Sequence, residues 1–392
     1  MSADTRLAPL SPSEYEERIQ RLQAEMSSAG LDAFVGYSSE SESGCSRYLA
    51  GFWPFFDFSC VVVPASGRAA LVTGGPESFE FASRFVKAAD IRVNPLLVES
   101  SPPDWVPESK GESFSSLLPS VCGRTPRRVG VGGWNIFPHL LFEDLRKGAP
   151  NAELVPADDV LLRVMSIKTV AEIPYIVEAY RITEESMKAS FRAVRAGKTE
   201  WELEAAARAA MATLGAEGTP YPPWVCSGPN TALSLCRSTD RTIQRDELVQ
   251  FTFGARYMGY CGNMCRPFAV GRLPAKARKL IEVGLEAMQY ALSAIRPGKK
   301  AAEVFQGYYD ILARYGYESF TLYGPAHGTG HSEVEGLWLA QKADFTIQPN
   351  MLFNIDIWLS DGQNGMRWED GVLVTGDGLR ELTSWRREVI EL

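Results

Sequence analysis

Hydrophobic residues recur with a helical period near the start of the chain and then gather in short runs. Residues 11–30 keep apolar side chains at helical spacing, open with a Ser-x-x-Glu signature and end at a glycine, which predicts a helix. An apolar run follows at residues 31–37. Two strand-like runs, 60–64 and 69–73, flank a short Ala-Ser-Gly-Arg turn and predict a hairpin.

The first half of the chain continues with the same mixture of elements. Residues 129–131 read as a short strand, and a helix is expected near 140–147, before a Gly-Ala-Pro stop. Because strands and helices are interleaved, we expect residues 1–160 to form an α/β domain.

The second half, residues 161–392, has longer helical patterns and paired strand-like runs. A capping box at Thr199–Glu202 opens one helix, which should end at Gly215. The other helices are expected at residues 173–194, 275–295 and 301–315, and strands at 248–253, 256–260, 351–358 and 366–375. Helices followed by paired strands favour an α+β domain.

Composition and charge exclude several classes of partner. The net charge is −8 and the basic residues are not clustered, so neither nucleic acid nor an anionic membrane is expected. The first ten residues contain no apolar core of a secretion signal, and no apolar run is long enough to span a membrane. Seven cysteines without regular spacing favour reduced thiols and a cytoplasmic protein.

Five segments together resemble one family. They are residues 163–173, Ser-Gly-Pro-Asn-Thr at 227–231, 253–260, Gly-Pro-Ala-His-Gly-Thr-Gly-His at 324–331 and Trp-Glu-Asp-Gly-Val-Leu-Val-Thr at 368–375. In order and spacing they are similar to the "pita-bread" catalytic domain of the creatinase, prolidase and aminopeptidase P group. The first half likewise resembles the creatinase-type N-terminal domain. The resemblance therefore implies an α+β pita-bread domain preceded by a creatinase-type α/β domain.

Metal-dependent members of this family hold two divalent ions with five side chains, and the resemblance assigns each ligand a position here. Carboxylate oxygens are suitable ligands for hard divalent ions. A carboxylate that binds both ions holds them close enough together to activate a bridging water. The two aspartates fall on Thr252 and Asn263, the histidine on His327 or His331, and the two glutamates on Asp356 and Glu369.

The two aspartate positions have lost their charge, which removes two of the negative charges that a pair of divalent ions requires. We therefore expect no tightly bound cofactor, as in creatinase, which lacks the metal set. The alternative is one divalent ion held by His327, Asp356 and Glu369. Creatine itself is not expected as substrate, because two positions used by creatinase fall on Leu235 and Cys265.

The remaining groups suit acid–base chemistry. His327 or His331 would act as base and acid, with Glu369 as partner. Cys265 would be a nucleophile if its thiolate were favoured, although a cysteine in a strand is commonly a buried small hydrophobe. The predicted substrate contacts are Thr252, Asn263, Asp356 and Tyr260, of which Thr252 and Asn263 could instead fill the vacated metal space.

An aromatic run at residues 52–58 contains Trp53, Phe55 and Phe56. It resembles the segment by which one subunit of a creatinase-like homodimer reaches the active site of its partner, where it would bind an apolar or cationic group. The alternative is a core strand with surface aromatic residues.

The sequence thus predicts a homodimeric hydrolase that cleaves a C–N bond of a small polar metabolite without a metal. The alternatives are a mononuclear metal hydrolase or Xaa-Pro peptidase, a catalytically inert member that binds a ligand, and a lyase that uses the same bases.

Overall fold

The structure is a computed structural model that describes residues 7–86, 88–98 and 110–392. The chain divides into two compact units, Met1–Met165 and Ser166–Leu392.

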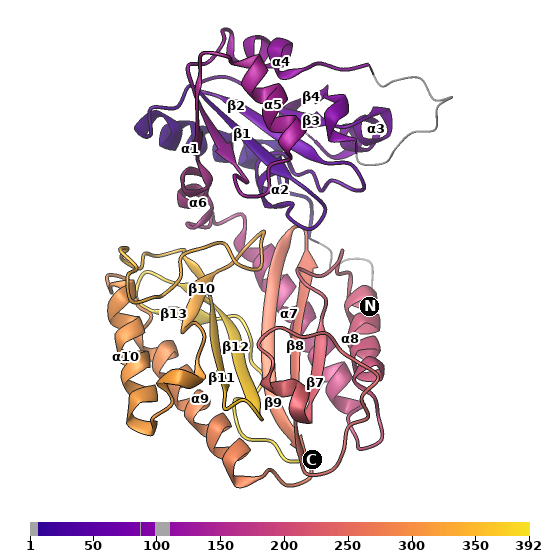
Figure 1. Cartoon of the computed structure of the whole chain (residues 1–392), viewed down its shortest axis with the longest axis vertical. Coiled ribbons are helices and arrows are strands. Elements are labelled where there is room, and N and C mark those ends of the chain that lie inside the picture. The colour runs from indigo at the N-terminus through magenta and orange to yellow at the C-terminus, as the bar shows by residue number, and fades with distance from the viewer. Residues whose placement is uncertain (1–6, 87, 99–109) are drawn as a thin grey trace. The chain divides into compact units, whose positions relative to one another are not determined.

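The N-terminal unit is built on a mixed six-stranded sheet with the order β4-β3-β2-β1-β5-β6 (Figure 1). Its strands are β1 (Ala33–Ser38), β2 (Ser59–Pro64), β3 (Ala69–Thr73), β4 (Ala89–Val93), β5 (Arg128–Gly132) and β6 (Glu153–Pro156). Its helices are α1 (Pro12–Ser28), α2 (Gly44–Ala50), α3 (Pro76–Phe85), η1 (Pro95–Leu97), α4 (Phe114–Cys122), α5 (His139–Gly148) and α6 (Asp158–Met165).

Both faces of this sheet are buried, because successive side chains of a strand point to opposite sides. In β1, Phe34 packs with residues of α1, α2 and α6, whereas Val35 packs with residues of α4 and α5. The alternation within one apolar run therefore separates two hydrophobic cores, one on each face of the sheet.

Local signals in this unit act as predicted. The side chain of Ser11 accepts a hydrogen bond from the Glu14 amide at the start of α1, and Gly30 lies beyond its end with a φ of +66°. Strands β2 and β3 form the expected antiparallel hairpin. The alternative reading of residues 52–58 as a strand is wrong, since they form a loop in which Phe56 has a φ of +60°.

The C-terminal unit contains a seven-stranded sheet. Along the path β10-β11-β12-β9-β8-β7, every described pairing is antiparallel, and β13 pairs with β12. The strands are β7 (Trp224–Ser227), β8 (Glu247–Tyr257), β9 (Tyr260–Val270), β10 (Ala326–Gly328), β11 (Leu352–Ser360), β12 (Gly365–Val374) and β13 (Leu379–Glu381). The helices are α7 (Ile173–Arg192), α8 (Glu200–Leu214), η2 (Gly228–Ala232), α9 (Ala275–Ala294), α10 (Ala301–Tyr315) and η3 (Glu318–Phe320).

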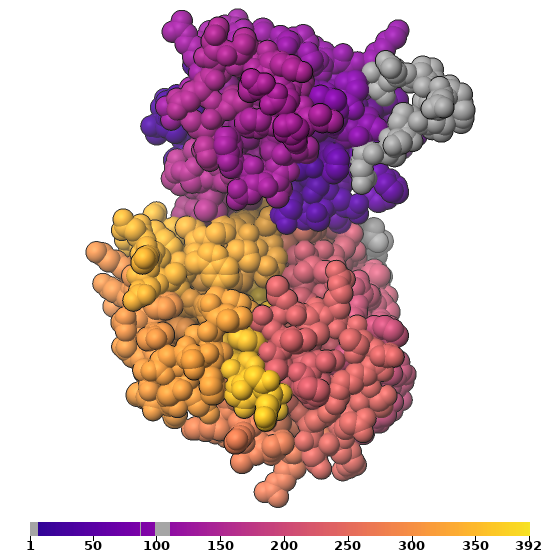
Figure 2. Space-filling view, in the orientation of Figure 1, coloured from indigo at the N-terminus to yellow at the C-terminus, as the bar shows by residue number. Residues whose placement is uncertain are grey.

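The sheet of this unit consists of two halves that meet at one point. In the first half, α7 and α8 accompany β7–β9, and in the second half α9 and α10 accompany β10–β12 (Figure 1). Strands β9 and β12 pair at Glu369 and Cys265. On the face shown in Figure 2, the pink and orange surfaces of the two halves lie on either side of yellow residues from near the end of the chain.

The capping box at the start of α8 is confirmed, with reciprocal hydrogen bonds between Thr199 and Glu202, and the helix ends at Gly215 in the left-handed conformation. Strand β9 shows where sequence reasoning was wrong. We predicted a strand at residues 256–260, but this segment contains the end of β8 and a two-residue turn. Both turn residues, Met258 and Gly259, have positive φ, which matches a tight hairpin.

Among the residues that the structure describes, no helix is both long enough and apolar enough to cross a bilayer.

Candidate metal and catalytic site

A row of side chains crosses the sheet of the C-terminal unit at the junction of its two halves. The pairing register places Asp356 opposite Glu369, Glu369 opposite Cys265, Cys265 opposite Thr252, and Thr252 opposite Trp224. Residues that are directly opposite in adjacent strands share a face of the sheet. The resemblance had placed four of these residues at one site, and the register explains how segments far apart in sequence meet there.

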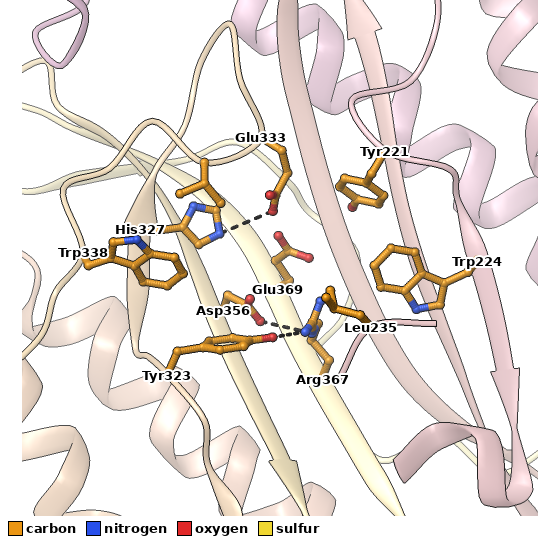
Figure 3. A pocket seen from close by; sticks show the side chains of 11 residues that line it. Tyr221, Trp224, Leu235, Tyr323, His327, Glu333, Trp338, Asp356, Arg367 and Glu369 are labelled. Atoms are coloured by element: carbon orange, nitrogen blue, oxygen red, sulfur yellow. Dashed lines mark hydrogen bonds and ion pairs between the residues drawn. The ribbon is translucent and has the colours of Figure 1, made fainter. Parts of the chain in front are cut away.

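This face borders a cavity of about 200 Å³ in the C-terminal unit (Figure 3). Ligand pockets in proteins commonly measure ~300–1,000 Å³, so this one suits a small substrate. The residues that line it are Tyr221, Trp224, Leu235, Tyr323, His327, Glu333, Val334, Trp338, Asp356, Arg367 and Glu369.

Three of the lining residues form a potential metal site. One ligand atom each of His327, Glu333 and Glu369 lies within 4.8 Å of the others. His327 is buried, and its Nε2 atom lies 3.6 Å from Glu333 Oε1 without a hydrogen-bond partner among the described residues. The Nδ1 atom lies 3.0 Å from the Gly328 carbonyl oxygen, to which it donates. This fixes the tautomer and leaves the Nε2 lone pair facing the two carboxylates, as metal ligation requires.

Glu369 is held in place by two donors. The side-chain amide of Asn354 donates to Oε1, and the Cys265 thiol donates to Oε2 at 2.7 Å. Asn354 in turn accepts a hydrogen bond from the Tyr180 hydroxyl. Burial, together with the neighbouring charge of Asp356, raises the pKa of Glu369 well above its ordinary value. A cation in the pocket would offset both effects and favour the carboxylate.

The prediction that Cys265 is a nucleophile is not supported by its surroundings. The side chain is fully buried, and burial followed by the charge of Glu369 raises its thiol pKa well above the usual value. A nucleophilic cysteine needs the thiolate. The protonated thiol is instead a hydrogen-bond donor that orients the Glu369 carboxylate.

A second carboxylate, Asp356, faces a cation rather than the imidazole. Its Oδ1 atom lies 3.4 Å from Nε of Arg367, and both side chains are about 6% exposed. Arg367 also donates to the Tyr323 hydroxyl (Figure 3) and to the Ser234 carbonyl oxygen, which lies 2.9 Å away. Burial, reinforced by the charge of Asp356, raises the pKa of Tyr323, which keeps the phenol neutral.

The charges around the cavity do not cancel. Its described lining includes three carboxylates, Glu333, Asp356 and Glu369, and one guanidinium, Arg367, so acidic side chains outnumber basic ones. A divalent cation is attracted to such a set of carboxylate oxygens. The donor set of one imidazole nitrogen and carboxylate oxygens therefore fits one divalent ion.

His331 and Tyr260 lie together, and neither is among the described residues that line the cavity. Their rings are 4.3 Å apart, and the Tyr260 hydroxyl donates to Glu172 at 3.1 Å. The backbone amide of His331 donates to Glu335. Of the two candidate histidines, the structure thus places His327 in the cavity, whereas Tyr260 packs in the interior rather than at the predicted substrate site.

Thr252 and Asn263 are buried in the sheet and do not contribute to the described cavity lining. Both atoms of the Asn263 amide lack hydrogen-bond partners among the described residues, and Thr252 accepts a long hydrogen bond of 3.4 Å from Gln250. These neutral groups occupy the positions that the resemblance gives to two aspartates. Their burial agrees better with side chains that fill the space of absent metal ions than with side chains that contact a substrate.

The aromatic residues predicted to reach a partner subunit belong to the N-terminal unit. Phe55 and Phe56 are 56% and 64% exposed, and the Trp53 indole donates to the Glu40 carbonyl. Their contact with a substrate stays a prediction.

Sequence reasoning missed several residues of the cavity. Glu333 lies in an irregular segment after β10, where no periodicity marks an inward-facing position. Arg367 could have been found from its position two residues before Glu369 in a predicted strand, which places both on one face. The missed lining residues are Tyr221, Trp224, Tyr323, Glu333, Val334, Trp338 and Arg367.

A pocket with this donor set on this fold is typical of a metal-dependent hydrolase, and comparisons with known proteins agree. Residues 175–376 match Metallopeptidase family M24, and residues 18–165 match the Creatinase/Prolidase N-terminal domain. The chain belongs to the M24 family and is a hydrolase of that family. The fold class predicted from the sequence is confirmed.

Relatives with the same architecture are named as peptidases. The chain is 30% identical over 286 residues to an Xaa-Pro dipeptidase of Pyrococcus furiosus, covering 73% of this chain and 81% of the relative. It is also 30% identical over 254 residues to an Xaa-Pro dipeptidase of Pyrococcus horikoshii, with 64% and 72% covered. The solved prolidase from Pyrococcus horikoshii superposes with a TM-score of 0.81 at 24% identity, covering 95% of this chain and all of the other.

These matches correct two predictions. The expectation of no cofactor is contradicted, because the family is one of metallopeptidases and its named relatives are Xaa-Pro dipeptidases. The restriction to C–N bonds other than peptide bonds conflicts with the same names. The error arose from giving the lost aspartates too much weight, since Glu333 supplies a carboxylate that the resemblance did not reveal.

Proposed function

We propose that this protein is a hydrolase of short peptides or related small amides that uses one divalent metal ion. The observation that carries the proposal is the convergence of His327 Nε2 with Glu333 and Glu369 in a small cavity whose described lining holds three carboxylates and one guanidinium. The relatives named Xaa-Pro dipeptidase support a dipeptide as substrate.

The residues at the site would divide the work. His327, Glu333 and Glu369 would hold the ion, which would polarise the scissile carbonyl and activate a water. Asp356 lies opposite Glu369 in the sheet and has an Oδ1 atom without a hydrogen-bond partner among the described residues, so it can accept a proton. The same Oδ1 atom lies 3.4 Å from Nε of Arg367, which would hold the Asp356 side chain in this position.

Aromatic side chains would position the substrate. Tyr221 and Trp224 lie across the cavity from His327 and Trp338 (Figure 3). The rings of His327 and Trp338 are 5.0 Å apart, and those of Tyr221 and Trp224 are 5.2 Å apart. Two aromatic walls bury the apolar surface of a small ring such as that of proline and exclude water from the reacting bond.

The stoichiometry distinguishes this site from a two-ion centre. Two divalent ions would require a charge near −4, and Thr252 and Asn263 contribute none. We therefore expect about one equivalent of metal, without a second ion at the Thr252 and Asn263 positions.

The test is metal content and peptide hydrolysis measured together. Protein purified without chelator should contain about one equivalent of Mn²⁺, Zn²⁺ or a similar ion by elemental mass spectrometry, and should lose hydrolysis of Xaa-Pro dipeptides on chelation. His327→Ala should lose the ion. His331→Ala is the matched control, because this histidine lies outside the cavity lining, and it should keep the ion if the variant is folded by circular dichroism. Metal retained in His327→Ala and lost in His331→Ala would refute the assignment.

Assembly, location and domain division are further proposals. We propose a cytoplasmic homodimer, in keeping with seven cysteines that are all free thiols in the structure. Sedimentation at several concentrations tests the dimer. We also propose that the chain has two domains that divide near residue 160. Separate expression of the two parts tests that division.

A further inference from the structure

One aromatic wall of the cavity carries two buried polar atoms that call for a ligand. The hydroxyl of Tyr221 and the Nε1 atom of Trp224 are both buried, and neither has a hydrogen-bond partner among the described residues. Trp224 is only 7% exposed, and both side chains line the cavity on the side opposite His327 (Figure 3). A buried O–H or N–H group without an acceptor is costly, so such groups are normally paired with protein, water or ligand.

Polar side chains elsewhere on the lining are engaged by the protein itself. The Tyr323 hydroxyl accepts a hydrogen bond from Arg367. Arg367 also donates to the Ser234 carbonyl oxygen, and its Nε atom faces Asp356 at 3.4 Å. The two donors on the aromatic wall differ from these groups, because their proton-bearing atoms are buried at the cavity and are left to an acceptor that enters it.

The local sequence fixes both donors in place. Tyr221 lies between Pro220 and Pro222, and proline restricts its own backbone and that of the residue before it. Pro220 packs against β8 at Gly254, where a Cβ atom would lie 2.8 Å from Cγ of the proline ring. Trp224 is the first residue of β7, and its ring centroid lies 5.2 Å from that of Tyr221. A wall that is already rigid loses little entropy when it binds a ligand.

The chemistry of the two groups selects the kind of atom that binds them. An indole N–H can only donate a hydrogen bond. A tyrosine hydroxyl is protonated at neutral pH, because its ordinary pKa is about 10. Both groups therefore require an acceptor, and on a short peptide the acceptors are carbonyl and carboxylate oxygens.

We propose that Tyr221 and Trp224 form a hydrogen-bonding subsite for an acceptor oxygen of the substrate, which is either the scissile carbonyl oxygen or an oxygen of the terminal carboxylate. This inference rests on the proposed function, since it requires a substrate beside the ion. The proposed ion ligands lie between residues 327 and 369, whereas the two donors lie at or just before β7, in the first half of the sheet. A bound substrate therefore spans the junction of the two halves, with an oxygen turned towards the aromatic wall.

Conservative variants remove each donor and keep an aromatic ring. Tyr221→Phe loses only the hydroxyl, and Trp224→Phe loses the indole N–H. Each should lower kcat/KM for the dipeptide Ala-Pro about 10–100-fold, the range expected for one hydrogen bond to a charged acceptor. Tyr309→Phe is the control, because this tyrosine of α10 is 38% exposed and is not among the described residues that line the cavity, so its kinetics should not change. Metal content should equal that of the wild type in all three variants, which separates a lost substrate contact from a damaged ion site.

A substrate without the terminal charge distinguishes the two oxygens. If the donors bind the terminal carboxylate, the loss in the variants should shrink to about 3-fold or less with alanyl-prolinamide, whose terminal amide is neutral. If they bind the scissile carbonyl oxygen, the loss should be the same on both substrates and should fall on kcat, because that oxygen gains charge in the transition state.

The outcomes separate this inference from the proposed function. Wild-type kinetics in a folded Tyr221→Phe or Trp224→Phe would overturn the subsite and leave the proposed hydrolase standing. Absence of dipeptide hydrolysis in the metal-loaded wild type would overturn the proposed function, and this inference with it. Because the two donors are removed separately, poor folding of one variant would not protect the inference.

Discussion

The buried ion pair beside the candidate site allows a quantitative prediction. Asp370 is fully buried and accepts from Arg266 at 2.8 Å and from Arg387 at 2.6 Å, and it also accepts from the Thr383 hydroxyl. Arg266 is itself about 1% exposed and donates to the Glu369 carbonyl oxygen at 3.1 Å. Asp370→Ala therefore leaves a buried guanidinium without its carboxylate.

The cost of this change follows from the loss of one partner of a buried pair. Such a loss costs about 3–5 kcal/mol, because the remaining charge is neither solvated nor neutralised. With a urea dependence of about 3 kcal/mol per molar, the unfolding midpoint should fall by roughly 1–1.7 M. Glu388→Ala is the matched control. Its partner, Arg386, is equally close at 2.6 Å, but both side chains are more than half exposed, so the expected change is about 0–1 kcal/mol.

Urea unfolding followed by tryptophan fluorescence is the appropriate assay. The Trp368 ring lies 5.6 Å from the Arg266 guanidinium, and Arg266 also donates to the Trp385 carbonyl oxygen, so both indoles are near the change. The reasoning would be refuted if Asp370→Ala shifted the midpoint no more than Glu388→Ala does. A large shift in both variants would show that burial does not distinguish the two pairs.

Three further predictions concern the site and one helix. Cys265→Ser should keep hydrolysis within a few fold, because a hydroxyl can still donate to Glu369, whereas Cys265→Ala should weaken metal affinity about 10–100-fold as measured by calorimetry. A loss of turnover in the serine variant equal to that in the alanine variant would instead restore the nucleophile hypothesis. Burial raises the pKa of Glu369, so metal affinity should rise by up to about tenfold per pH unit over the range in which Glu369 loses its proton. The stability of the apo-protein should fall over the same pH range, because a raised pKa in the folded state means that folding favours the protonated carboxyl group. Titrations in buffers of different ionisation enthalpy should show this proton release, and an affinity that is constant with pH would contradict it. Thr199→Ala should destabilise the protein by about 1 kcal/mol in thermal unfolding through loss of the cap of α8, and Thr199→Ser should restore most of it.

The elements best predicted from the sequence are those with local signals. Helix α10 was predicted at residues 301–315, and it begins and ends there. Its end follows from Gly316, which has a φ of +69° and closes the helix in a conformation that glycine adopts without strain. Such signals depend on a few neighbouring residues and need no knowledge of the fold.

The missed strand shows the opposite case. Strand β9 contains Pro267, and proline within a run argues against a strand because it cannot donate to the ladder. Pairing with β8 overrides that local preference, since Pro267 lies opposite Gln250 in a regular register. The strand is stabilised by long-range contacts that no window of sequence contains.

The candidate site was predicted in part for the same reason. Glu369, Asp356 and His327 could be found because they lie in segments that resemble the family. Glu333 could not be found in this way. It lies in an irregular segment, and only the folded course of that segment brings its carboxylate close to His327. The contact of Cys265 with Glu369 could not be predicted either, because only the pairing of β9 with β12 places the thiol beside that carboxylate.

The junction between β9 and β12 has a consequence for motion. Every side chain proposed to hold the ion, together with Asp356, comes from residues 327–369, on the second half of the sheet. The first half, which carries Thr252 and Asn263, contributes no charge to the ion. A bound ion would therefore not bridge the two halves directly and would reach the first half only through the Cys265–Glu369 hydrogen bond. Hydrogen exchange of β8 should then be the same with and without the ion, while exchange of β10–β12 slows.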